Sequence, residues 1–582
     1  MLFSAHVLER FAHGVRRAQA GGGTARRMPR GKRSAASFSD RALHGPSRRP
    51  VRAALLRAKG RARLAVSNMI GGRTVGRTHC RGVHLLLKRT HPATIIAQSA
   101  RPERNSYYML RRFLCLVFAV LLLLGAFSVC AAAAGEISRV SCCVYGSDGR
   151  GFSWFTDEEG GSDVQILKTA DFSGDFSAAE TYSGKATRYR GRFSHHVAVT
   201  GLEKGTSYTY RVGDKAADVW SESCSFVTDD GDDAVPFLVL ADVQAGSIDH
   251  FRHAAQTVAA GLDVLPDAEF CVNLGDYVND NTNEEWDWYF EQFSFANNRM
   301  THVPVAGNHD GNITNKLNTF SFPSMFCLDT ADNRSLEGVY YSFDWGNIHF
   351  TVLNTNDMYP MSQAQRNWFV NDVSGSNAQW KVVLMHRSLY SAGKNINKPD
   401  TVILRNDLLP LVDKLGIDLI LSGHDHMYLR TKPVRGEKAM ETQTVQDSFK
   451  GETLTFLKDP AGTVYALPST AGTKRYAVNE RAMPPILDVA ETAFSTSDLG
   501  GCFAAVETDG NKLVYKAYCV DDETREVTEV DRFALLKTEE RVSTPTKYDT
   551  TLVSSIVSYP FNLLTALVKM LISYVKLLGS VV

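Results

Sequence analysis

Five apolar runs of strand length in the middle of this 582-residue chain are each followed closely by a residue type that binds metals. The runs span residues 236–241, 268–274, 302–306, 380–385 and 417–422. The polar residues that follow them are Asp242, Asp276, Asn308, His386, and the pair His424 and His426. Because strands of an α/β sheet line a crevice at their carboxyl ends, we expect these side chains to lie together in one site.

Helical stretches alternate with these runs, at residues 250–262, 362–373 and 406–415. Ser362 is a candidate N-cap of the second stretch, and Gly416 stands where the third would end. Several of the strand-length runs are apolar throughout, as in strands that are covered on both faces. The pattern predicts an α/β layered domain over residues 235–535, with helices on both sides of a sheet.

The six polar side chains form a chemically consistent set of two carboxylates, one amide and three imidazoles. This set suits Fe, Mn or Zn better than Ca or Mg, and the lack of a thiolate argues against a structural zinc site. Gly275, Gly307 and Gly423 directly precede three of the six and let the backbone turn tightly off a strand. A carboxylate shared by two ions allows them to clamp a phosphoryl group and activate water, so the set predicts a two-metal site.

Residues 137–228 show a different pattern, in which short stretches alternate apolar and polar residues between glycine-containing turns. The stretches at 151–156, 196–200 and 207–212 are examples, and Gly201, Gly205 and Gly213 punctuate them. Strands at this spacing over about 90 residues predict an all-β sandwich. No constellation of catalytic residues appears within it.

The five motifs in order resemble the calcineurin-like metallophosphoesterase family. The run HHVAVTGLEKGTSYTYRVGD, which starts at His195, is similar to the fibronectin-III-like domain that precedes the catalytic domain of purple acid phosphatases. The resemblance covers residues 137–535 and implies an α/β domain with mixed sheets behind the sandwich. It also implies two metal ions, which would be Fe, Mn or Zn, and a phosphate-ester substrate.

The resemblance further implies which residues hold the ions and which act on the substrate. His309 would face the substrate and donate a proton, with Asp310 orienting it, while water activated by the metals attacks phosphorus. The function implied is that of an exported phosphomonoesterase of the acid phosphatase type. The implied ligands are Asp276 between the ions, Asp242 and His426 on the first ion, and Asn308, His386 and His424 on the second.

The sequence departs from the family pattern at two positions near the first ion. Gln244 stands where the broad family has a metal-binding histidine two residues after the first aspartate. Asn279 stands where purple acid phosphatases have a tyrosine three residues after the bridging aspartate, and Tyr277 is displaced from that place. Gln244, Asn279 or water would complete the set of ligands on the first ion, and the three alternatives remain open.

Two other functions are compatible with the same residues. The first is a phosphodiesterase or nucleotide pyrophosphatase, because one metal site serves both monoesters and diesters and the surrounding loops decide between them. The second belongs to another class, a non-catalytic cell-surface binding protein with a degenerate metal site, which the departures at Gln244 and Asn279 would explain. Metal content and activity towards matched esters distinguish the three.

The N-terminal region is a basic, low-complexity extension followed by an export signal. Residues 1–108 contain 20 Arg and 3 Lys but only 3 acidic residues, which leaves 41 basic and 60 acidic residues of the 64 and 63 in the chain. We interpret 1–108 as disordered or absent from the mature protein, and 109–135 as a signal peptide with charged, apolar and small-residue parts. A retained transmembrane helix at 113–134 is the alternative. The acidic remainder argues against a nucleic-acid partner.

The C-terminal residues 552–582 predict an apolar amphipathic helix. Within 561–582 the six polar residues are spaced by three or four, so they form one narrow stripe on a helix. One interpretation is a helix packed on the protein or associated with itself, and the other is contact with a membrane surface. The sequence therefore predicts a secreted or extracytoplasmic protein, with membrane association through 561–582 as an open alternative, and it does not indicate an oligomeric state.

Overall fold

The computed structural model describes residues 136–311, 322–331, 339–356, 361–479 and 488–538. The basic extension at 1–108, the signal peptide at 109–135 and the C-terminal helix at 552–582 lie outside the described residues. Among the residues that are described, none of the helices combines the length and the apolar character needed to cross a bilayer.

The first part of the described chain is the predicted β-sandwich. Its strands are β1 (Ser138–Tyr145), β2 (Gly149–Thr156), β3 (Asp163–Lys168), β4 (Glu180–Ser183), β5 (Lys185–Tyr189), β6 (Arg192–Val199), β7 (Ser207–Asp214), β8 (Val219–Trp220) and β9 (Cys224–Val227). Strands β1, β2, β6 and β5 form one layer, and β4, β3, β7, β8 and β9 form the other. Alternate residues such as Phe152, Trp154 and Tyr210 fill the core between the layers, as the period of two predicts.

The α/β part contains two large sheets among the described residues. The first continues through β12 (Thr301–Pro304), β11 (Phe270–Asn273), β10 (Pro236–Leu240), β24 (Gly501–Asp509), β25 (Lys512–Val520), β26 (Val527–Leu536), β21 (Glu452–Lys458) and β20 (Gln443–Phe449). The second runs in the order β13 (Tyr341–Trp345), β14 (Ile348–Leu353), β15 (Trp380–Arg387), β16 (Leu419–Gly423), β22 (Val464–Pro468), β17 (Tyr428–Thr431) and β23 (Ala490–Phe494). Strands β10 to β12 are parallel, whereas β24 is antiparallel to β10, so the sheets are mixed as expected.

Helices lie on the outer side of each sheet. They are α3 (Ile248–Val264), α4 (Asn283–Gln292), α5 (Ser294–Asn297), α6 (Gln363–Gly375) and α7 (Pro399–Leu415). Ser362 caps α6 by accepting a hydrogen bond from the backbone N–H of Gln365, and Gly416 ends α7 with φ +66°, as the sequence predicts. Helix α7 begins seven residues earlier than predicted, because Pro399 supplies the fixed φ that suits a first helical turn.

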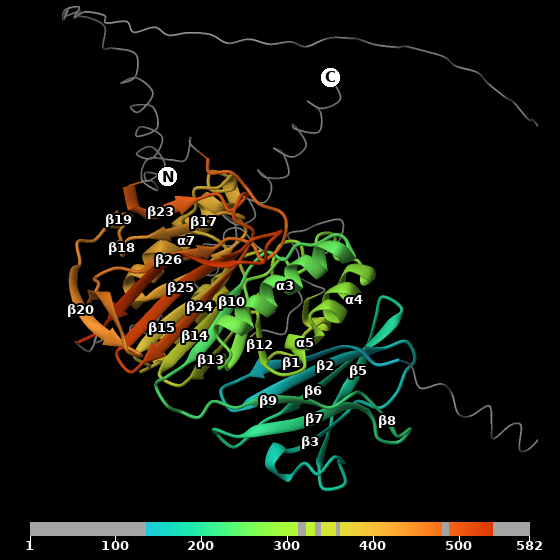
Figure 1. The fold of residues 1–582 in the computed structure, drawn as a ribbon. Helices are drawn as coiled ribbons and strands as arrows, with labels where there is room; N and C mark the ends of the chain where they lie inside the picture. The colour runs from blue at the N-terminus through green and yellow to red at the C-terminus, as the bar shows by residue number, and fades with distance from the viewer. Residues whose placement is uncertain (1–135, 312–321, 332–338, 357–360, 480–487, 539–582) are drawn as a thin grey trace, which may run out of the picture. The chain divides into compact units, whose positions relative to one another are not determined.

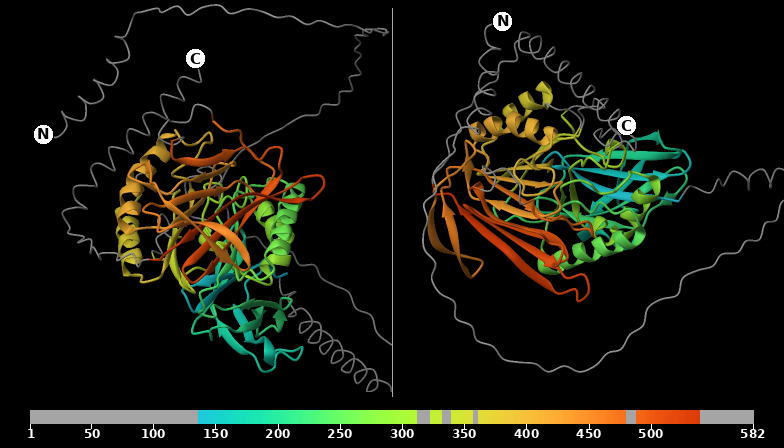
Figure 2. Two further views of the ribbon diagram at one scale, coloured as in Figure 1. Left: turned by 60° about the vertical axis from the view of Figure 1, so that its left-hand side comes forward. Right: turned by 90° about the horizontal axis from the view of Figure 1, so that it is seen from above.

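The two sheets pack face to face, which corrects the expectation of helices on both sides of one sheet. Val239 of β10 and Val382 of β15 point into the same central core. Leu238 packs with Phe251 of α3 on one outer side, and Val383 packs with helix α7 on the other. The order is therefore helix, sheet, sheet, helix, and Figure 2 shows the helical layers on opposite sides. An apolar run indicates a strand covered on both faces, but not whether a helix or a second sheet covers it.

One sheet runs through both the sandwich and the α/β part. Strand β1 pairs in parallel with β12, with Cys143 opposite His302. The buried guanidinium of Arg150 reinforces this junction, because its Nε donates to Oγ1 of Thr301 at 2.9 Å and it lies over the ring of Trp345. The sandwich is therefore joined to the α/β part through backbone pairing as well as through side chains.

Candidate metal centre

The predicted ligands lie at the carboxyl ends of strands from both sheets. Asp242, Asp276 and Asn308 follow β10, β11 and β12 of the first sheet. His386 lies near the end of β15, and His424 directly follows β16, both in the second sheet. The parallel direction of these strands explains why residues far apart in sequence meet at one edge.

Asp242, Asp276 and His426 form a first buried group, in which one donor atom from each residue lies within 4.8 Å of the others. Nε2 of His426 is 3.3 Å from Oδ1 of Asp242. The exposed fraction of each of the three residues is 1% or less. Two carboxylates so deeply buried need a compensating positive charge.

Asp276 also belongs to a second buried group, with His386 and His424. Nε2 of His386 lies 3.2 Å from Nδ1 of His424 and 3.3 Å from Oδ2 of Asp276. Asn308 joins this group, because its Oδ1 is 3.1 Å from the same Nε2 atom. The structure thus brings all six predicted residues into two groups that share Asp276.

Backbone amides hold the two carboxylates in place. Oδ1 of Asp276 accepts the N–H of His309 at 2.7 Å. Both oxygens of Asp242 lie about 3 Å from the N–H of His424, at 3.0 and 2.9 Å. Because Oδ1 of Asp276 is occupied in this way, its Oδ2 atom is the one that faces His386.

Two of the imidazoles are fixed in the tautomer that leaves a lone pair facing the carboxylates. Nδ1 of His386 donates to the carbonyl of Leu274 at 2.8 Å, and Nδ1 of His426 donates to the carbonyl of Lys474. In the neutral form of each ring the proton therefore lies on Nδ1, and Nε2 has a free lone pair. This arrangement is the one in which a histidine binds a metal while its other nitrogen is held by a hydrogen bond.

The donor atoms have the spacing and the charge that a pair of cations requires. Donors on one ion, each about 2.1 Å from it, are roughly 3.0–3.5 Å apart, and the four contacts given above range from 3.1 to 3.3 Å. Burial lowers the pKa of His386, but the charge of Asp276 outweighs it and raises this pKa to about 9. The carboxylates thus draw positive charge to this position, and the residues present fit two metal ions.

The backbone around the site adopts conformations that few residues tolerate. Asp242, Asp276 and His424 have φ values of +51°, +55° and +74°, in the left-handed region that costs non-glycine residues about 1–3 kcal/mol each. A Cβ atom on Gly307 would lie 2.3 Å from Oδ1 of Asp276, and one on Gly423 would lie 2.6 Å from Oδ2 of Asp242. These two glycines are therefore required by the close approach of the carboxylates.

Asp310 has a different place from the one expected. Its fully buried carboxylate accepts the backbone N–H groups of Asp276, Tyr277 and Gly307 at 2.8–2.9 Å. Nδ1 of the neighbouring His309 donates instead to the backbone carbonyl of Asn279. The group that orients His309 is therefore this carbonyl, and Asp310 joins the loop after β11 to the loop after β12.

Tyr277 does not replace the tyrosine that the purple acid phosphatase pattern has at 279. Its side chain is fully buried and packs against Trp286, Tyr289 and Phe326 in the outer core. Consecutive residues of an extended segment point to opposite sides, so the neighbour of Asp276 faces away from the carboxylates.

Comparison with known proteins agrees with this geometry. Residues 235–428 match the family model of calcineurin-like phosphoesterases, and residues 138–228 match that of the purple acid phosphatase N-terminal domain. The chain therefore carries a calcineurin-like phosphoesterase domain behind a purple acid phosphatase N-terminal domain.

Individual relatives cover parts of the chain. Purple acid phosphatase 21 of Arabidopsis thaliana is 28% identical over 272 residues, which are 45% of this chain and 59% of that protein. An uncharacterized protein of Mycobacterium tuberculosis is 27% identical over 208 residues, or 33% of this chain and 39% of that protein. The chain thus spans about two fifths to two thirds of the length of the curated relatives it matches. The structure of a purple acid phosphatase from yellow lupin seeds shares the fold, with a TM-score of 0.57, 16% identity, and coverage of 72% of this chain and 78% of that one.

Arg387 lies at the edge of the second group in the phosphoesterase domain. Its Nη1 atom is 3.0 Å from Oδ2 of Asp400 and 3.0 Å from Nε2 of His424. Burial lowers the pKa of His424, and the guanidinium charge of Arg387 lowers it further. Arg387 therefore keeps this imidazole neutral, with Nε2 of His424 accepting its hydrogen bond.

Tyr476 is a residue of the phosphoesterase site that sequence reasoning missed. Its ring stacks on that of His426, with centroids 4.3 Å apart and planes 13° from parallel. Its backbone N–H donates to the carbonyl of His426 at 2.8 Å. The segment follows β22, but its position beside His426 depends on where the loop returns, which the pattern of apolar runs does not show.

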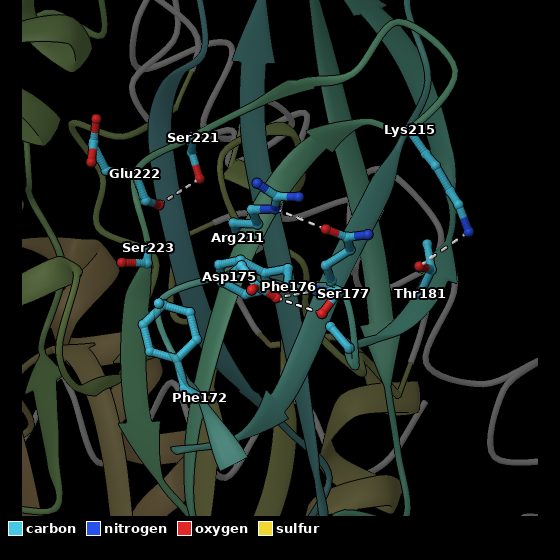
Figure 3. Close-up of a pocket in the computed structure, with 13 residues that line it drawn as sticks. Phe172, Asp175, Phe176, Ser177, Thr181, Arg211, Lys215, Ser221, Glu222 and Ser223 are labelled. Carbon is cyan, nitrogen blue, oxygen red and sulfur yellow. Dashed lines mark hydrogen bonds between the residues drawn. The ribbon is translucent and has the colours of Figure 1, made fainter. Parts of the chain in front are cut away.

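The purple acid phosphatase N-terminal domain has a pocket of about 650 Å³ that contains none of the predicted metal ligands. Figure 3 shows Arg211 and Lys215 in it together with Asp175 and Glu222, so charges of both signs are present. Arg211 lies over Phe176 and Trp220 and donates to Gln165. These contacts fix the outer face of the sandwich and bring no catalytic group together.

Proposed function

We propose that this protein is an exported phosphoesterase that uses two metal ions to hydrolyse phosphomonoesters. The observation that carries the proposal is the pair of buried donor groups that share Asp276 at the carboxyl edges of both sheets. They lie in a domain that matches calcineurin-like phosphoesterases. Two adjacent donor groups that share a carboxylate suit a clamp on phosphate.

Each donor group would hold one ion, and Fe, Mn and Zn are all compatible with the donors. Asp242 and His426 would hold the first ion, and Asn308, His386 and His424 the second, with Asp276 shared between them. Bound metals would neutralise charge on the phosphoryl oxygens and lower the pKa of water.

The residues around the ions would position substrate and protons. His309 would protonate the oxygen of the leaving group from Nε2, because its Nδ1–H is held by the carbonyl of Asn279. Asp310 would act only through its hydrogen bonds to the backbone, which hold Asp276 and the amide of Gly307 in position.

We also propose that the protein acts outside the cytoplasm. The charged, apolar and small-residue parts of 109–135 support export, and the amphipathic pattern of 561–582 supports contact with a membrane surface. The mature protein would then begin near residue 136, without the basic extension.

Purified protein from residue 136 onwards tests the proposed activity. It should hydrolyse an aryl phosphate in the presence of Fe, Mn or Zn, lose activity with a chelator, and regain it when metal is restored. The proposal would be contradicted if none of these ions supported turnover, or if fewer than two ions were bound per chain. Comparison of kcat/KM for matched monoesters and diesters tests the substrate class, and a preference for the diester would contradict the monoester assignment.

A further inference from the structure

The two proposed ions have unequal numbers of protein ligands. The second has Asp276, Asn308, His386 and His424, whereas the first has Asp242, Asp276 and His426 among the described residues. Three protein ligands leave a metal open to water and weaken its retention. Gln244, which departs from the family pattern two residues after Asp242, lies close enough to Asp276 to supply a fourth ligand.

Gln244 is held against the shared carboxylate by its own backbone. Its N–H donates to the carbonyl of Asp276 at 2.7 Å, and its φ of +35° turns the chain back towards the site. The exposed fraction of the residue is 5%, and Nε2 lies 3.2 Å from Oδ2 of Asp276. The side chain therefore contacts the carboxylate oxygen that faces His386.

The amide oxygen of Gln244 is the unsatisfied atom in this arrangement. Oε1 is buried and accepts no hydrogen bond from any residue that the structure describes. A buried acceptor without a partner costs about 1–3 kcal/mol. A cation beside Asp276 would supply a partner for Oε1 when the amide is turned so that Oε1 faces the carboxylate.

Rotation of the amide by 180° about its terminal bond exchanges the oxygen and the nitrogen without changing its shape. Oε1 then lies 3.2 Å from Oδ2 of Asp276, the separation now measured from Nε2. Two acceptor oxygens repel each other at this distance unless a cation binds both. The separation falls within the range of 3.1–3.3 Å found between the other donor atoms of the site.

Asn279, the other candidate, is engaged elsewhere. Its side-chain Nδ2 donates to Oδ2 of the exposed Asp280 at 2.9 Å, and its backbone carbonyl accepts from His309. We propose that Oε1 of Gln244 is the fourth protein ligand of the first ion. This inference rests on the proposed two-metal function.

The added oxygen changes which metal the first position prefers. Its donors become two carboxylates, one amide oxygen and one imidazole, whereas the second position has two oxygens and two imidazoles. Oxygen ligands favour harder ions such as Mn²⁺, and imidazoles favour Zn²⁺. Gln244 thus biases the first position towards the harder ion, and a histidine at 244 would reverse the bias.

Metal binding to the purified full chain tests this inference without an activity assay. After metal-free protein is dialysed against Mn²⁺, the wild type should retain two ions per chain by mass spectrometry. Gln244→Ala should retain one, and calorimetry should show the weaker Kd rising by about tenfold or more. Gln244→Glu keeps an oxygen and should retain two ions, as should the matched control Asn279→Ala. Gln244→His should raise the share of Zn²⁺ in a mixture of the two metals.

The variants separate a ligand from a residue that only supports Asp276. If Gln244 acts by donating its side-chain N–H to the carboxylate of Asp276, Gln244→Glu should lose an ion as Gln244→Ala does. This result would overturn the inference. Wild-type affinity in Gln244→Ala would overturn it as well. Failure of the wild type to bind two ions would instead contradict the proposed function itself. Circular dichroism of each variant checks that the fold is retained, and Gln244→Glu provides the test should Gln244→Ala not fold.

Discussion

Nε2 of His386 lies 3.1 Å from Oδ1 of Asn308, although the two residues belong to the edges of different sheets. Asn308 follows β12 in the first sheet, and His386 lies near the end of β15 in the second. An ion between them would therefore tie the two sheets together at their carboxyl edges.

Asn308→Ala should weaken binding of the second ion, because it removes one oxygen ligand. Activity should fall strongly, and excess metal should restore part of it, since incomplete occupancy is the defect. Titration of the rate with metal checks this, with Asn298→Ala outside the site as the control. A rate that does not respond to added metal would exclude a ligand role for Asn308.

His309→Ala should leave both ions bound while lowering kcat by roughly 10²–10⁴-fold, the range for loss of a general acid. The deficit should shrink for substrates with good leaving groups, which need little protonation. Metal analysis together with rates plotted against the pKa of the leaving group measures both effects. Loss of an ion, or an equal deficit for every substrate, would show that His309 has another role.

Asp310→Ala should destabilise the protein and empty the site, although Asp310 makes no metal contact here. Three buried N–H groups would lose a charged acceptor, and each such bond contributes about 1.5–3 kcal/mol. Unfolding in denaturant should show a loss of at least about 3 kcal/mol, with fewer ions retained. Asp280→Ala, at an exposed position, serves as the control. Wild-type stability in Asp310→Ala would contradict the role of Asp310 in joining the two loops.

His349 should make stability depend on pH far from the active site. Burial lowers its pKa, but hydrogen bonds and charges from Asp344 and Asp372 outweigh burial and raise the pKa to about 9. Because this value exceeds the pKa of about 6.5 in an unfolded chain, the stabilisation is complete below about pH 6.5 and is lost as pH rises through 9. Relative to His349→Gln, the wild type should lose roughly 2–3 kcal/mol of unfolding free energy between pH 6 and 10. If the unfolding free energies of the wild type and of His349→Gln changed with pH in parallel, this prediction would be contradicted.

The sequence predicts the ligand-bearing strands well because their pattern is local. A fully apolar run followed by a polar residue identifies both a buried strand and its carboxyl end, as for Asp242 after β10. Cap residues are equally local, and Ser362 and Gly416 lie where the sequence places them. These features depend on neighbours within a few residues.

The features that the sequence does not predict depend on partners distant in the chain. The assignment of β10 and β15 to separate sheets depends on which faces meet, and apolar composition is the same for both. The acceptor role of Asp310 towards Asp276 spans 34 residues and uses backbone N–H groups, which carry no sequence signal. The contact of Tyr476 with His426 likewise depends on where a loop returns.

The pairing of β1 with β12 has a consequence for how this enzyme can be divided. Without β1, the outer side of β12 would present unpaired N–H and C=O groups next to an apolar face. Such an open border recruits strands from other molecules, and natural proteins usually shield it. The sandwich thus protects the catalytic part from aggregation, and a chain cut at residue 235 would lose that protection even though it keeps every metal ligand.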